Sequence, residues 1–173
     1  MIFHSDGFQT HRYEKSIAVI TDFDILVVKF KTMPQSYSAL WAHLIWSTKN
    51  REPILVPALK HEVYKVINDI ANAHEIYLDC INGVEDHVHL LVRLRTDQCI
   101  SEIVKTIKGN SWDHFKDDDE KYVTWQDGFA AFTVSPGHVK RVRNYIYNQE
   151  KHHRSKSFSD ELKEIKESAK SQI

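Results

Sequence analysis

The sequence predicts a single α+β domain, and three observations lead to that prediction. The chain has 173 residues, of which 42% are hydrophobic and 27% are charged, as is usual for one globular domain. Some segments are short apolar runs typical of strands, whereas others repeat apolar residues at helical spacing. These segments follow one another in the order strand, helix, strand, strand, helix, strand, helix.

Residues 38–48 are predicted to form the first strand, because aromatic and apolar residues crowd the segment before the polar Lys49. Pro57 then stands where the first residue of a helix is often proline. The residues that repeat at helical spacing after it are Leu59, Val63, Val66, Ile67 and Ile70. They predict a helix over about residues 58–75.

Two strands are expected next, over residues 76–81 and about 86–94. Asn82-Gly83 lies between these apolar runs, and this dipeptide favours a tight hairpin turn. The two strands are therefore predicted to pair as an antiparallel hairpin that turns at Asn82 and Gly83.

The remaining elements complete a known arrangement. Thr96 or Asp97 is expected to cap a second helix, residues 129–134 form a fourth strand, and Ser135-Pro136 opens a third helix over about 136–150. A short polar helix over about 158–170 closes the chain. The order matches a ferredoxin-like βαββαβ sandwich with an antiparallel sheet and an added C-terminal helix that carries Tyr145. Many functions use this architecture, so it decides none of them.

The first 32 residues read differently from the rest. They hold the apolar run Ile25–Val28 but no cap and no sustained period. Met33 is one candidate for the natural start, with residues 1–32 as an extension, and a real N-terminal strand is the alternative. We expect the functional domain at 33–156 and a polar helix or tail at 157–173.

Composition excludes several classes of protein. Cys80 and Cys99 form no CxxC pair, which argues against a disulfide scaffold or a four-thiolate metal site and favours a reducing cytoplasm. No apolar run approaches the roughly 20 residues that span a bilayer, so we expect no membrane partner. The net charge of −1 means that any attraction to nucleic acid must come from local patches.

His87-Val88-His89 lies in the third predicted strand. Side chains alternate between the two faces of a strand, so the two imidazoles share one face while Val88 takes the other. Two neutral imidazoles at that spacing can bind one divalent cation. A pair of ordinary histidines on a polar face is the alternative, and an isolated His-x-His pattern does not exclude it.

Tyr145 and Gln149 lie four residues apart in the third predicted helix, which makes them neighbours on one face. A tyrosine there could act as a nucleophile, and the glutamine oxygen could be a third metal ligand. Tyr147 competes as nucleophile, but its neighbour at the same spacing is Lys151, which cannot bind a metal while protonated. His43 also stands on a strand, and we interpret it as structural or as a DNA contact.

Five segments together resemble the HUH tyrosine transposases, the small insertion-sequence transposases called TnpA, with the repeat-associated tyrosine transposases as relatives. The resemblance covers about residues 33–152. The segments are Trp41 to Arg51, Asp86 to Val92, the Lys-Gly-Asn-Ser sequence from Lys108 to Ser111, Trp125 to Phe132, and Tyr145 with Gln149. Each is weak alone, but the five in this order are specific.

The resemblance implies a role for each matching residue. His87, His89 and Gln149 would hold Mg²⁺ or Mn²⁺, and Tyr145 would attack a phosphodiester to give a 5′-phosphotyrosine and a free 3′-OH. The substrate would be single-stranded DNA with hairpin ends. It also implies a homodimer in which His87 and His89 of one chain meet Tyr145 and Gln149 of the other; a monomer with the helix packed in cis stays open.

Basic residues surround the predicted tyrosine helix. Six Lys or Arg residues and one acidic residue, Glu150, lie between Gly137 and Lys156, and such a local excess can contact phosphates. The candidate DNA contacts are Lys108, Ser111, Lys140, Arg141, Arg143, Lys151 and Arg154. Trp112 and Trp125 could stack on unpaired bases, although lone aromatic residues more often belong to a core.

The sequence thus favours a metal-dependent transposase that cuts and rejoins single-stranded DNA. One alternative is a domesticated relative that binds hairpin DNA without cutting it. An unrelated RNA-binding domain of the same fold is disfavoured, because the aromatic strand motif of such domains is missing.

Overall fold

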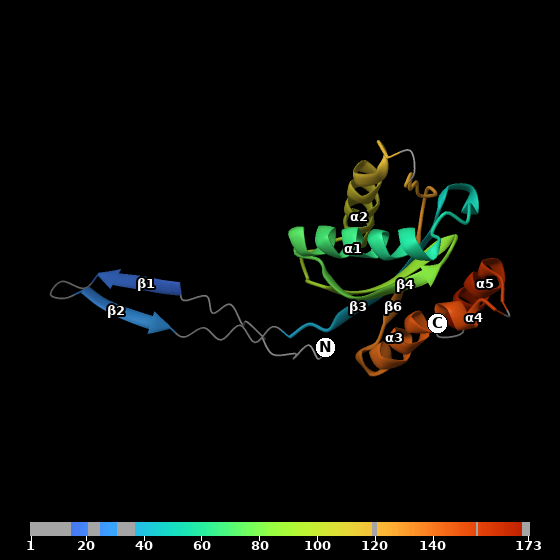
Figure 1. Cartoon of the computed structure of the whole chain (residues 1–173). Coiled ribbons are helices and arrows are strands. Elements are labelled where there is room, and N and C mark those ends of the chain that lie inside the picture. The colour runs from blue at the N-terminus through green and yellow to red at the C-terminus, as the bar shows by residue number, and fades with distance from the viewer. Residues whose placement is uncertain (1–14, 21–24, 31–36, 119–120, 155, 171–173) are drawn as a thin grey trace, which may run out of the picture. The chain divides into compact units, whose positions relative to one another are not determined.

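The computed structural model describes residues 15–20, 25–30, 37–118, 121–154 and 156–170, in two units, Met1–Tyr37 and Ser38–Ile173 (Figure 1). In the first unit, β1 (Lys15–Ile20) pairs antiparallel with β2 (Ile25–Phe30). The apolar run Ile25–Val28 therefore lies in a strand. Met33 lies outside the described residues, and its role as a start stays a prediction.

The second unit holds a four-stranded antiparallel sheet. Its strands are β3 (Leu40–Ser47), β4 (Tyr77–Val84), β5 (His87–Leu94) and β6 (Ala130–Val134), and they lie side by side in the order β4-β5-β3-β6. The two middle strands pair antiparallel with each other, with Ser47 opposite His87 and Leu40 opposite Leu94. This order, with one helix after β3 and one after β5, confirms the ferredoxin-like α+β prediction.

Helices cover both faces of the sheet (Figure 1). The helices α1 (Pro57–Ala73) and α2 (Ile100–Phe115) lie together on one face. The segments α3 (Val139–Tyr147), α4 (Gln149–His152) and α5 (Phe158–Lys170) lie on the other. None of the helices in the described part of the chain is long and apolar enough to cross a bilayer.

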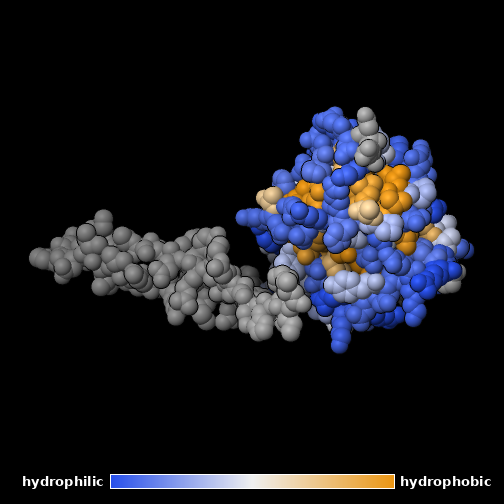
Figure 2. All heavy atoms as spheres, in the orientation of Figure 1, coloured by the Kyte–Doolittle hydropathy of each residue, from blue (hydrophilic) through white to orange (hydrophobic). Residues whose placement is uncertain are grey.

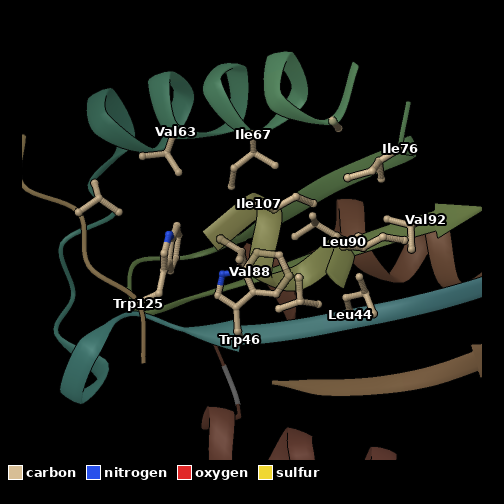
Figure 3. Close-up of a cluster of buried hydrophobic side chains, with 14 of the residues drawn as sticks. Leu44, Trp46, Val63, Ile67, Ile76, Val88, Leu90, Val92, Ile107 and Trp125 are labelled. Carbon is tan, nitrogen blue, oxygen red and sulfur yellow. The ribbon is translucent and has the colours of Figure 1, made fainter. Parts of the chain in front are cut away.

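The main core lies between the sheet and α1 and α2. Figure 3 shows Val63 and Ile67 of α1 pointing toward Leu44, Val88 and Leu90 of the sheet. All five side chains are completely buried. Burial of such side chains contributes about 1.5–3 kcal/mol each relative to exposure, so this face of the sheet supplies most of the driving force for folding. In Figure 2, hydrophilic residues cover most of the described surface in view.

The hairpin turn is not where the sequence predicted it. β4 continues through Asn82 and Gly83 to Val84, and the turn falls at Glu85 and Asp86. Gly83 faces Val88 across the ladder, and a Cβ at Gly83 would lie 2.1 Å from the carbonyl oxygen of His87. The glycine therefore permits close approach of β5 rather than a turn.

The predicted helix boundaries also needed correction. The second helix begins at Ile100, after Cys99, and Asp97 pairs with Arg95 instead of capping it. The third predicted helix, 136–150, is divided into a 3-10 turn (Pro136–His138), α3 and α4, with Asn148 between the last two. The polar helix at 158–170 is confirmed as α5.

Candidate metal and tyrosine site

The two histidines of β5 lie on the face of the sheet away from the main core. Alternation along the strand sends Val88 and Leu90 to the core, and His87 and His89 to the opposite side. Both imidazoles have no solvent exposure, and their ring centroids are 5.0 Å apart. The predicted pair on one face is therefore confirmed, at the middle of the sheet.

A different neighbour orients each imidazole. Asp86 Oδ1 lies 2.6 Å from Nδ1 of His87, and His43 Nε2 lies 2.9 Å from Nδ1 of His89. Arg51 in turn donates to Asp86 Oδ2 at 3.0 Å. With Nδ1 occupied on both rings, Nε2 is the atom that each histidine presents to the site. In metal-binding histidines, too, one ring nitrogen binds the metal while the other is held by a neighbouring group.

Three buried polar atoms lack a hydrogen-bond partner among the described residues at this point. They are Nε2 of His87, Nε2 of His89 and Oε1 of Gln149. An unpartnered buried polar atom costs about 1–3 kcal/mol, so three of them together call for an additional partner. All three are atoms of a kind that can bind a metal ion, and they belong to the three residues that the resemblance implied.

The break at Asn148 still leaves Tyr145 and Gln149 together. Asn148 has φ −98° and ψ 18° and ends α3, and Asn82 of β4 donates to the carbonyl oxygens of Ile146 at 3.0 Å and Tyr147 at 3.1 Å. Tyr145 and Gln149 then point to one carboxylate, that of Glu161. The pairing inferred from helical spacing is reached through two short helices fixed to the sheet edge.

Sequence reasoning missed Glu161 and His153. The Glu161 side chain is 1% exposed; its Oε1 accepts hydrogen bonds from the Tyr145 hydroxyl and, at 3.0 Å, from Gln149 Nε2. Its Oε2 lies 3.0 Å from His153 Nε2 and 3.5 Å from Nε2 of both His87 and His89. An apolar stripe of Phe158, Leu162 and Ile165 at helical spacing with Glu161 inside it was the available signal.

The histidines and the carboxylate are held in different protonation states. Burial lowers the pKa of His89 to about 4 and that of His43 to about 3, so both rings are neutral at pH 7. Burial also lowers the pKa of His87, but the hydrogen bond to Asp86 and the nearby carboxylate of Glu161 outweigh it and raise the value. The pKa of Glu161 is lowered in spite of burial, because the nearby imidazoles of His87 and His89 favour its charged form.

The tyrosine hydroxyl keeps its proton in this arrangement. Burial, followed by the hydrogen bond to Glu161, raises the pKa of Tyr145 above its ordinary value. A protonated phenol is a poor nucleophile. In this arrangement the Tyr145 hydroxyl is therefore not activated as a nucleophile.

The donor set fits a divalent cation. One ligand atom from each of His87, His89, His153 and Glu161 lies within 4.8 Å of the others, and Gln149, whose Nε2 donates to Glu161, has a buried Oε1 without a hydrogen-bond partner. Ligands on one ion at about 2.1 Å lie about 3–4 Å apart, which these separations approach. A mixed nitrogen and oxygen set suits Mn²⁺ better than Mg²⁺, which prefers oxygen.

The competing tyrosine lies elsewhere. Tyr147 is 57% exposed, and the charged groups that influence it are those of Asp79 and Arg143. Tyr145, by contrast, has its ring 6.1 Å from that of His89. The structure thus brings Tyr145, and not Tyr147, to the histidine pair.

The predicted DNA contacts fall into two groups. Lys140, Arg141, Lys151 and Arg154 are exposed, and Arg154 lines an open cleft of about 560 Å³ together with Arg51, Lys60, Asp86 and His153. Three others are engaged within the fold: Arg143 forms a two-pronged pair with Asp79, Lys108 donates to the carbonyls of Gln126 and Gly128, and Ser111 is buried against Trp125. Ser111 offers DNA no surface in this conformation.

The two remaining aromatic candidates also differ in exposure. Trp125 is buried in the core, 6.0 Å from Trp46. Trp112 is 42% exposed, with Lys116 over its ring. Only Trp112 of these two presents a surface on which a base could stack.

Comparison with known proteins agrees with the geometry. The curated ISDra2 transposase TnpA of Deinococcus radiodurans is 28% identical over 114 residues, which cover 62% of this chain and 81% of the relative. A crystal structure of a transposase from D. radiodurans R1 aligns with 28% identity and a TM-score of 0.52, over 69% of this chain and 98% of the other. A REP-associated tyrosine transposase bound to a REP hairpin shares the fold, with TM-score 0.55 and 15% identity over 72% of this chain and 74% of that one. The family model of IS200-like transposases matches residues 36–149, and the chain belongs to this family.

Proposed function

We propose that this transposase cuts and rejoins single-stranded DNA at hairpin-bearing ends, through a covalent 5′-phosphotyrosine at Tyr145. One observation carries the proposal: the hydroxyl of Tyr145 and the Nε2 atoms of His87 and His89 meet at one buried carboxylate. Nucleophile and metal-ligand atoms are thus within reach of the same phosphate group.

His87, His89 and Gln149 would hold the divalent ion, Mg²⁺ or Mn²⁺. Their free donor atoms support this assignment, and Asp86 and His43 fix the two rings in the required orientation. A bound ion would withdraw charge from the phosphate and orient it. Metal dependence is a prediction that follows from this donor set.

The chain's own contribution to the chemistry is the tyrosine. The Tyr145 oxygen forms a bond to phosphorus, the bond from phosphorus to the 3′ oxygen breaks, and that oxygen leaves as a 3′-OH after taking up a proton. The tyrosine proton is lost in the same step. The phosphotyrosine keeps the energy of the original bond, so a second 3′-OH can reverse the reaction on another strand without ATP.

Single-stranded DNA with a hairpin is the proposed partner. A neighbour of the same fold was solved with a REP hairpin. Exposed Lys140 and Arg141 on α3 and Lys151 on α4 offer positive charge to phosphates on the helices that carry Tyr145 and Gln149. We keep Lys108 and Arg143 as weaker candidates, because the fold already uses both.

Assembly divides into two separate predictions. The homodimer stays a prediction from the resemblance. Within one chain, Tyr145 and Gln149 reach His87 and His89 through Glu161, and this contact supports the alternative of a site built in cis. Mixing His87→Ala with Tyr145→Phe after subunit exchange tests this: cis sites give no activity, whereas sites shared in trans would restore about a quarter.

A denaturing gel tests the function itself. Labelled single-stranded hairpin DNA is incubated with the protein and Mn²⁺, and we expect a protein–DNA adduct that survives denaturation and disappears with EDTA. Binding in a native gel without any adduct or cleavage would instead support the domesticated hairpin-binding protein. A DNA duplex of the same sequence serves as the control and should not form the adduct.

A further inference from the structure

We propose that α5 closes the active site of the free protein and that Glu161 occupies the position that the scissile phosphate must take. This rests on the proposed function, because it concerns access to the same tyrosine. The C-terminal helix would then regulate cleavage: DNA can be cut only after Glu161 has left the site.

The first argument is the position of the carboxylate. In the proposed reaction the phosphate must touch the Tyr145 oxygen, since the reacting atoms have to approach within about 3–3.5 Å. Glu161 Oε1 already accepts the hydrogen of that hydroxyl and the amide hydrogen of Gln149. A phosphodiester, like a carboxylate, offers two oxygens that share one negative charge, so the same donors would receive it.

The second argument concerns the other oxygen of the Glu161 carboxylate, Oε2. Glu161 Oε2 lies 3.0 Å from His153 Nε2 and 3.5 Å from Nε2 of both His87 and His89. It therefore stands between the nucleophile and the ligand atoms, as a phosphate linking Tyr145 to a bound ion would. One carboxylate thus lies against the Tyr145 hydroxyl, the Gln149 amide and the Nε2 atoms of His87, His89 and His153.

The third argument is access. His87, His89 and Gln149 have no solvent exposure and Glu161 has 1%. A DNA strand cannot reach a site that is enclosed on the side of α5. Phe158 helps to close it, because the centroid of its ring lies 4.3 Å from that of His87. The guanidinium of Arg51 lies 4.9 Å from the centroid of the same Phe158 ring.

The composition of α5 suits a helix that can detach from the sheet face that carries His87 and His89. Its inner stripe has few large apolar residues, and its other face is polar, with Lys163, Glu164, Glu167 and Ser168 exposed. The family match ends at residue 149, before α5 begins. α5 thus lies outside the segment that the family model matches.

The alternative role for Glu161 is that of a permanent metal ligand or a base for Tyr145. The two roles predict opposite effects of the same substitution. A permanent ligand or base is required for cleavage, so its removal slows the reaction. A carboxylate that blocks the site must leave, so its removal accelerates the reaction at low DNA concentration.

Two full-length variants and a control variant separate these roles. Glu161→Ala removes the blocking group, Phe158→Ala loosens α5 without touching a ligand, and Glu167→Gln changes an exposed acid on the same helix. If the closed form outnumbers the open form about tenfold, the first two should form adduct up to about tenfold faster at subsaturating DNA. Glu167→Gln should match the wild type.

Hydrogen exchange gives a readout independent of cleavage. In Tyr145→Phe, with Mn²⁺ present, binding of single-stranded hairpin DNA should increase amide exchange in residues 158–170. Slower adduct formation by Glu161→Ala, or unchanged or slower exchange in α5 on DNA binding, would overturn the proposal. Absence of any adduct with the wild type would instead remove the proposed function, and the exchange result would still decide whether α5 leaves.

Discussion

The two faces of the central sheet are formed by the same strands but have different roles: one packs the main apolar core, and the other carries the candidate site. On β3 and β5, Leu44 and Leu90 point to α1 and α2, where they are sealed in an apolar core (Figure 3). Their neighbours His43 and His89 point to the opposite face and bond to each other. The larger apolar core thus lies on one face, while the other combines a smaller apolar cluster, which includes Leu91 and Ile146, with buried polar atoms that lack partners.

This difference explains how a small domain can carry an under-satisfied site. The unpartnered Nε2 atoms of His87 and His89 destabilise the fold by about 1–3 kcal/mol each. The opposite face offsets that cost with large buried side chains such as Trp46, Leu90 and Ile107. Substitutions on the two faces should therefore separate activity from stability.

The largest effect is expected at the tyrosine over the polar face. Tyr145→Phe should abolish adduct formation, because no other hydroxyl lies at the Glu161 carboxylate in the described part of the chain, and hairpin binding should stay within a few-fold. Tyr147→Phe is the matched control, since Tyr147 is mostly exposed and should remain active. The measurement is adduct yield on a denaturing gel; activity in Tyr145→Phe with loss in Tyr147→Phe would reverse the assignment.

Adjacent residues of β5 provide the sharpest test of the two faces. Leu90→Ala should lower the free energy of unfolding by about 3 kcal/mol and leave cleavage intact well below its melting temperature. His89→Ala should abolish cleavage and cost only about 1–2 kcal/mol, through the lost bond to His43. Urea denaturation and adduct assays on both variants measure this; equal stability losses would contradict the division.

Metal removal should affect chemistry far more than folding. At ten times its dissociation constant, a bound ion stabilises the chain by about 1.4 kcal/mol, which raises the melting temperature by about 3–6 °C for a chain of this size. EDTA should therefore stop cleavage and lower the melting temperature by no more than that. Unfolding of the protein on chelation would show a structural metal instead.

A smaller effect on activity is expected at Asp86, which contacts the candidate ligand His87 from outside the metal site. Asp86→Asn weakens the bond that orients His87, and loss of such an outer contact lowers metal affinity by about tenfold or more. Titration of Mn²⁺ followed by electron paramagnetic resonance measures the affinity directly. Asp69→Asn, an exposed change on α1, should have no effect, and an equal effect of the two variants would exclude a positioning role for Asp86.

Sequence reasoning succeeded where local periodicity controls the result. The two-residue period placed His87 and His89 on one face, and helical spacing related Tyr145 to Gln149. It failed at Asn82-Gly83, because the dipeptide serves close approach of β5 at Gly83 rather than a turn, and a turn signal does not distinguish these uses. The break at Asn148 depends on Asn82 binding the end of α3, a contact between residues far apart in the sequence.

Glu161 was missed for a different reason. A carboxylate in a polar helix is normally exposed to solvent, and the one local sign of burial is that Glu161 lies within the short apolar stripe of Phe158, Leu162 and Ile165. Its burial requires α5 to pack against a sheet face whose histidines receive the carboxylate. Only the tertiary structure brings these residues together.

Identification of the residue that becomes attached to DNA tests the central claim most directly. The adduct formed by the wild type with Mn²⁺ is isolated and digested, and the modified peptide is sequenced by mass spectrometry. We expect the nucleotide on Tyr145, joined through its 5′-phosphate, and a free 3′-OH on the released strand. A nucleotide on Tyr147, or cleavage that leaves no residue attached to DNA, would contradict the account.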